Sequence, residues 1–122
     1  MEDIADKKKH VLEIAELINS HKGLDTIALY VGKECSWSDF FIITTANSTS
    51  HMEGLLKHIK DYMENNEMPG FNNRGSLKSE KWRILDYGSI IIHLMSREAR
   101  GFYELEQLWF SGETIHQSSK SS

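Results

Sequence analysis

The stretch that most constrains this chain is a pair of strand-like segments around a tight turn, followed by an amphipathic segment. Trp82–Asp86 and Ile90–Met95 flank Gly88, which can adopt a positive φ, so the two segments are expected to pair as antiparallel strands. The second segment is almost wholly apolar and is expected to be a central strand. Ser96 is placed to cap a helix over 97–109, whose apolar residues fall on one face.

Four more elements are expected upstream of this hairpin, and the first three are a helix and two strands. Residues 6–21 carry apolar side chains at helical spacing, and Gly23 is placed to end that helix. Residues 26–31 alternate like a half-buried strand, and residues 40–45 are β-branched and aromatic, which is typical of a strand covered on both faces.

A second helix is expected to start at Ser50, because Ser50 and Glu53 match a capping box. Its apolar stripe is expected to support the core and consists of Met52, Leu55, Leu56, Ile59 and Met63. The predicted order is α-β-β-α-β-β-α, an α/β fold with helices packed on a mixed sheet. Residues 70–81 are expected to form a loop with a short edge strand near 71–74.

The composition fits one globular domain over 1–112, with a disordered tail over 113–122. The net charge of -4 argues against binding dominated by nucleic-acid phosphates. Cys35 is the single cysteine, so neither an intramolecular disulfide nor a multi-cysteine zinc site can form. No signal peptide or bilayer-spanning run is present, and a cytoplasmic location without a membrane is expected.

The sequence predicts no enzymatic turnover, cofactor or metal. Its six histidines form no HExxH pattern, and no nucleophile elbow or phosphate-binding glycine loop is present. His93 lies within an apolar strand and is expected to be a neutral, hydrogen-bonded core residue. Asp39 and Asp86 end strand-like segments, but neither belongs to the paired Asp-x-Asp of nucleotidyl transfer.

Three motifs resemble the ribosomal silencing factor family, also called RsfS or Iojap, over residues 28–109. Residues 38–45 (SDFFIITT) resemble the family's Asp-Tyr-Phe-Val-Ile-Ala-Thr segment, and residues 82–93 resemble its Trp-x-x-x-Asp-Tyr-Gly-Asp-x-x-x-His hairpin. Residues 102–109 (FYELEQLW) resemble its closing helix. Three departures stand out: Ser50 replaces an arginine, Ser89 replaces an acid, and Gly101 lies within the last helix at a cost of about 1 kcal/mol. That helix is expected to kink or to start late.

The resemblance implies a nucleotidyltransferase-like fold without catalytic acids. It also implies that the protein binds the large ribosomal subunit through the ribosomal protein numbered fourteen, with at most a minor contact to ribosomal RNA. A factor bound there blocks association with the small subunit by steric exclusion and represses translation. Such a protein is expected to be a monomer or weak homodimer. It would have no small-molecule substrate. Two alternatives stay open: a nucleotidyltransferase-like enzyme, and an RNA-binding adaptor in ribosome assembly.

The partner surface is expected on one face of the strand that begins at Trp82. A tryptophan beside an acid combines an apolar anchor with a charge that can pair with a basic ribosomal protein. Strand alternation separates Trp82 from Arg83, so only one face can belong to the interface. Tyr87 is included because it lies at the turn. The predicted partner-binding residues are Trp82, Ile84, Asp86, Tyr87, Asp39, Phe40, Arg100 and Tyr103.

Overall fold

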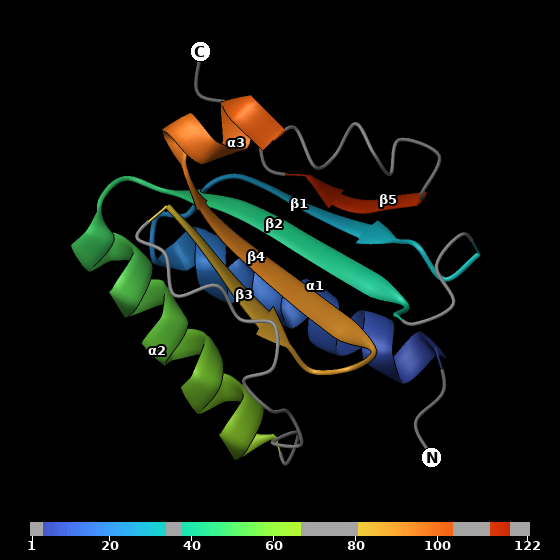
Figure 1. Ribbon diagram of the computed structural model, residues 1–122. Helices are drawn as coiled ribbons and strands as arrows, with labels where there is room; N and C mark the ends of the chain where they lie inside the picture. Colours follow the sequence, from blue (N-terminus) through green and yellow to red (C-terminus); the bar gives the residue numbers. More distant parts are fainter. Residues whose placement is uncertain (1–3, 34–37, 67–80, 104–112, 118–122) are drawn as a thin grey trace.

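The computed structural model describes residues 4–33, 38–66, 81–103 and 113–117 (Figure 1). The predicted order is confirmed, with one further strand at its end. The elements are α1 (Ile4–Ser20), β1 (Leu24–Tyr30), β2 (Phe40–Ala46), α2 (Thr49–Asn65), β3 (Trp82–Asp86), β4 (Ile90–Ser96), α3 (Arg97–Tyr103) and β5 (Glu113–Gln117). The predicted edge strand near 71–74, its loop and the end of the last helix lie outside the described residues.

The five strands form one mixed sheet in the order β3-β4-β2-β1-β5. The β2–β4 pair is parallel and runs from Phe40 opposite Ile90 to Ala46 opposite Ser96, whereas the other pairs are antiparallel. The expected hairpin forms between β3 and β4, and β4 is an interior strand as predicted. Every residue of β2 is buried, which confirms that it is covered on both faces.

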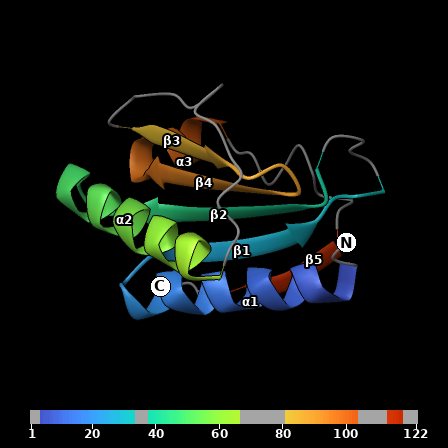
Figure 2. The ribbon, with the colours of Figure 1, turned by 90° about the horizontal axis from the view of Figure 1, so that it is seen from below.

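Helices α1 and α2 cover one face of the sheet, and α3 lies on the other (Figures 1 and 2). The stripe of α2 packs with α1, Phe40, Ile42 and Leu94 in a core on the helical face. The second core includes Phe41, Ile43, Ile91, Met95 and Ala99 of α3. Alternate residues of β2 and β4 therefore face the two cores, as the pleat of a strand requires.

The N-terminus of α2 differs from the predicted capping box. The cap is Ser48, whose Oγ accepts a hydrogen bond from the backbone N of His51 at 3.1 Å, and the helix begins at Thr49. The prediction of Ser50 was wrong because several hydroxyl residues stand in a row and Glu53 suggested the later one. Glu53 instead pairs with Arg83 of β3. His51 Nδ1 accepts from the backbone N of Asn47 at 2.9 Å, so an imidazole fixes the chain entering the helix.

Residues 113–117 form β5 rather than part of a disordered tail. This strand pairs antiparallel with β1, from Ile27 opposite Gln117 to Tyr30 opposite Glu113. The expectation was wrong because polar composition signals disorder, while an unpaired strand edge offers backbone hydrogen bonds to any segment that reaches it. The tail prediction for 118–122 lies outside the described residues.

The ends of α1 and α3 refine two further expectations. After α1, Lys22 rather than Gly23 has the left-handed conformation, at φ 68°. Gly23 is required for space, because a Cβ there would lie 2.3 Å from Ile18 Cγ2. The predicted cap of α3 is confirmed, since Ser96 Oγ accepts from the backbone N of Ala99 at 3.1 Å. The helix begins at Arg97, so Gly101 does not delay its start.

None of the helices in the described part of the chain is both long and apolar enough to span a bilayer.

Candidate partner-binding surface

The predicted surface lies along β3, the strand at one end of the described sheet. Trp82 and Ile84 are half-buried and pack on the core that faces away from α1 and α2. Leu85 is buried on the helical face, and Arg83 pairs there with Glu53 of α2. The alternation predicted for this strand is thus confirmed: Trp82 and Ile84 share one face, and Arg83 and Leu85 share the other.

Trp82 is held in place by His93 of the neighbouring strand. Its indole Nε1 donates to His93 Nδ1 at 3.1 Å, and the ring centroids are 5.9 Å apart. His93 is 7% exposed and meets the ring of Phe41 edge-on at 5.3 Å. Burial lowers the pKa of His93 to about 4, so the imidazole is neutral at pH 7. A neutral core histidine was expected. Its bond to Trp82 fixes the orientation of the exposed part of the indole.

A neutral imidazole that accepts at Nδ1 carries its proton on Nε2. Nε2 is buried and has no hydrogen-bond partner among the described residues. His93 was predicted to lie in the core, but its contact with Trp82 was not predicted. The predicted hairpin could have indicated this contact. In paired antiparallel strands, side chains on the same face of the sheet become cross-strand neighbours.

Asp86 and Tyr87 form the turn after β3. Asp86 Oδ1 accepts from the backbone N of Gly88 at 2.8 Å, and Gly88 has the predicted positive φ, at 80°. Tyr87 packs against the core on the helical face. Burial raises the pKa of its hydroxyl, and the negative charge of Glu64 on α2 raises it further. Tyr87 therefore lies across the sheet from Trp82, and only its position in the turn keeps it near Asp86.

Phe40 does not belong to the surface. Its side chain has no exposed area and packs in the core on the helical face, with its ring centroid 5.4 Å from that of Tyr30. The prediction was wrong because β2 is covered on both faces, so its sequence carries no strict alternation from which a face can be read. Asp39 remains half-buried and pairs with Lys7 of α1 at 3.3 Å.

The remaining predicted residues fall at the two ends of β3. The backbone N of Asp39 donates to Ser89 O at 3.0 Å, which places Asp39 beside the turn that contains Asp86. Arg100 of α3 lies near the Trp82 end, where its Nη1 donates to Thr45 Oγ1 at 3.1 Å. Tyr103 is the last residue of α3, and its side chain lies outside the described residues.

The two acids considered for nucleotidyl transfer, Asp39 and Asp86, are therefore near one hairpin turn, but each has another contact. Asp39 bonds with Lys7, and Asp86 bonds with the turn amide of Gly88. Within the described ranges, no group of three or more His, Cys, Asp or Glu residues is placed to hold a metal ion.

Comparison with known proteins identifies the protein family. A family model described as "Ribosomal silencing factor during starvation" matches residues 4–122, which includes all three motifs. The chain belongs to the ribosomal silencing factor family. A ribosomal silencing factor of Treponema pallidum is 34% identical over 96 residues, which cover 79% of this chain and 86% of that protein.

Other relatives of this RsfS-family chain carry related names. A mouse protein named "Mitochondrial assembly of ribosomal large subunit protein 1" is 30% identical over 103 residues, and the chain spans 43% of its length. A crystal structure of a Chromobacterium violaceum protein has a TM-score of 0.72 at 24% identity, covering 99% of this chain and 97% of that one. This structural likeness supports the mixed α/β fold.

Proposed function

We propose that this protein binds the large ribosomal subunit in the cytoplasm and represses translation by blocking association with the small subunit. Membership in the ribosomal silencing factor family supports a role at the ribosome. Its relatives are named silencing factors rather than enzymes, which supports action by binding. The proposed contact on the subunit is the ribosomal protein numbered fourteen.

The observation that carries the proposal is the partly exposed Trp82 on the end strand of the described sheet. Large aromatic residues that are held rigid dominate binding energies at protein interfaces, because they lose little conformational freedom on binding. The bond to His93 holds Trp82 in this way. Ile84 extends the apolar area, and Asp86 and Arg100 flank it with opposite charges. The proposed surface therefore consists of Trp82, Ile84, Asp86 and Arg100, with Asp39 at its edge.

A bound factor of this kind needs no chemistry to silence a ribosome. It occupies surface that the small subunit would cover, so repression depends on its occupancy and on its dissociation rate relative to subunit joining. Because the chain has a net charge of -4, specific contacts to a basic protein are favoured over diffuse contacts to RNA phosphates.

Sedimentation with purified large subunits at limiting concentration tests this surface. Trp82→Ala and Asp86→Arg should each weaken binding by at least ~2 kcal/mol, about 30-fold, because truncating a hot spot has at least this effect. Trp82→Phe keeps an aromatic ring without the indole donor and should have a smaller effect. Asp61→Arg is the matched control, because it makes the same charge change at an exposed position on α2.

Circular dichroism should first establish that each variant is folded. Two further measurements test the finer parts of the proposal. Light scattering should show less subunit joining with the wild-type protein than with Trp82→Ala. The isolated ribosomal protein numbered fourteen should retain the wild-type protein on a column but not Asp86→Arg. Full co-sedimentation of folded Trp82→Ala and Asp86→Arg would rule out this surface.

A further inference from the structure

The parallel strands β2 and β4 end side by side, at Ala46 and Ser96. From there the chain leaves toward opposite faces of the sheet, because α2 packs on the core of the helical face and Ala99 of α3 packs on the other. In open α/β sheets, ligands bind outside the carboxyl ends of the strands where adjacent connections diverge in this way. The divergence of α2 and α3 creates such a position in this sheet.

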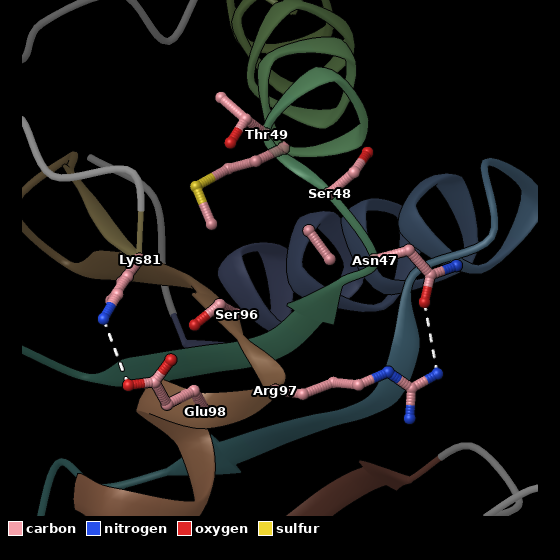
Figure 3. A pocket seen from close by; sticks show the side chains of 9 residues that line it. Asn47, Ser48, Thr49, Lys81, Ser96, Arg97 and Glu98 are labelled. Carbon is pink, nitrogen blue, oxygen red and sulfur yellow. Dashed lines mark hydrogen bonds and ion pairs between the residues drawn. The ribbon is translucent and has the colours of Figure 1, made fainter.

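A cavity of about 330 Å³ occupies this position (Figure 3). Buried Ala46 and Met52 contribute apolar surface to it. The volume is at the lower end of the ~300–1,000 Å³ that small-molecule sites span. The other lining side chains in the described part of the chain are polar or charged and include Asn47, Thr49, Lys81, Ser96, Arg97 and Glu98.

The charged lining residues come from opposite sides of the cavity. Lys81 and Glu98 lie on one side, where Lys81 Nζ is 3.1 Å from Glu98 Oε1 (Figure 3). Arg97 extends along the other side, and its Nη2 donates to Asn47 Oδ1 at 3.2 Å. A guanidinium has five N–H donors, so this bond positions Arg97 and leaves it further capacity to bind.

Among the described lining residues, two cations and one carboxylate give the cavity an excess of positive charge in a chain whose net charge is -4. A guanidinium matches the geometry of phosphate oxygens, and an ammonium adds a second charge-assisted contact. The hydroxyl groups of Thr49 and Ser96 also line the cavity and can act as donors. We propose that this cavity binds a small phosphate-bearing ligand, with Arg97 and Lys81 contacting the phosphate.

This site would bind its ligand without reacting with it. Asp39 and Asp86 lie at the opposite ends of the strands from the cavity, because β2 starts next to Asp39 and β3 runs antiparallel to β4. Seven residues of strand separate the two ends by about 20 Å. The cavity adjoins the Trp82 end of the proposed partner surface, because Lys81 directly precedes Trp82, but the two sites share no residue.

Titration of the isotope-labelled protein with sodium pyrophosphate, followed by amide NMR at constant ionic strength, tests the proposal. We expect saturable shifts at Asn47, Lys81 and Arg97, with a Kd of about 1 mM or lower. Arg97→Gln should weaken binding at least ~10-fold, the change expected from losing one charge-assisted hydrogen bond. Glu98→Gln should strengthen binding, because it removes the carboxylate that competes for Lys81.

Lys60→Gln is the control for net charge, since Lys60 is exposed on α2 away from the cavity. It should leave the affinity unchanged. A parallel titration with adenosine diphosphate identifies which part of a ligand the cavity recognises. If adenosine diphosphate binds more tightly than pyrophosphate, the ligand is a nucleotide. If the two bind equally, the cavity recognises the phosphate group alone. Absence of saturable shifts up to about 10 mM pyrophosphate would overturn the proposal. Equal weakening by Arg97→Gln and Lys60→Gln, or tighter binding of single-stranded RNA than of either small probe, would also overturn it.

Discussion

The hydrogen bond between Trp82 and His93 joins a surface residue to the buried layer of the sheet. It requires His93 Nδ1 to be unprotonated, because a protonated ring has only donors. Protonation would also place a charge in a buried environment beside Phe41. Lowering the pH should therefore reduce the stability of the fold through protonation of His93.

Stability should fall by about 3 kcal/mol through His93 alone between neutral pH and pH 4. The pKa of His93 is about 4 in the folded chain, below its usual 6.5. In the window between these values the unfolded chain binds more protons than the folded chain, so the free energy of unfolding decreases as the pH falls. Urea denaturation at a series of pH values measures this change.

His93→Gln provides the comparison, because glutamine can accept from the indole but does not titrate. Other groups also change charge in this range, so the informative quantity is the difference between the two pH profiles. The profiles should converge toward acid pH. Parallel profiles would show that His93 is not the group responsible.

Single residues differ in how well their positions could be predicted from the sequence. Alternation within β3 placed Trp82 and Ile84 correctly on one face, because successive side chains of a strand point to opposite faces of the sheet. The same reasoning failed for Phe40, since β2 is an interior strand that is buried on both faces. The charged residues of the cavity were missed entirely, because Asn47 and Arg97 approach each other only through the pairing of β2 with β4.

Among the elements, α2 is stabilised by its N-terminal cap and by one stripe of buried apolar residues. Ser48→Ala should cost about 1 kcal/mol, because it removes the side-chain acceptor for the His51 amide. Ser50→Ala should change stability by less than about 0.5 kcal/mol, because Ser50 is exposed within the first turn. Chemical denaturation of both variants separates the two positions. A larger loss at Ser50 would mean that the helix starts later than Thr49.

The stripe of α2 gives a second pair of variants. Leu55 is 1% exposed, so Leu55→Ala should cost about 2–5 kcal/mol through lost burial and the cavity left behind. Leu56 is only partly buried against the same core, and Leu56→Ala should cost less. Denaturation midpoints of the two variants measure the contrast. Equal losses would show that the helix is rotated relative to this arrangement.

The elements that were predicted well are those with strong local signals. The amphipathic periodicity of α1 and α2 and the turn at Gly88 each follow from neighbouring residues. β5 was not predicted, because its polar residues become a strand only when the edge of β1 is available for pairing. The sequence of a short segment contains little information about long-range strand pairing of this kind.

For the whole molecule, the sheet consists of two antiparallel units that meet where β2 pairs with β4. One unit contains β1, β2 and β5, and the other is the hairpin of β3 and β4. The sequence predicted helices on a mixed sheet but not the strand order. No local signal specifies which strands of separate units become neighbours.

The β2–β4 pairing also has a consequence for the order of folding events. It joins Phe40 to Ile90 and Ile42 to Ile92, residues that are distant along the chain, whereas the β3–β4 hairpin closes locally. Distant contacts require the closure of long loops before they contribute stability, and this slows folding. The docking of the two units should therefore be the rate-limiting step, on a timescale of milliseconds to seconds.

Stopped-flow refolding of conservative core variants tests this order. Ile42→Val and Ile92→Val each remove one methylene at the junction of β2 and β4 and should mainly slow refolding. Ile18→Val, on α1, should mainly accelerate unfolding if the helix completes its packing after docking. If the two junction variants changed only the unfolding rate, the parallel junction would form after the rate-limiting step, and docking of the two units would not limit the rate of folding.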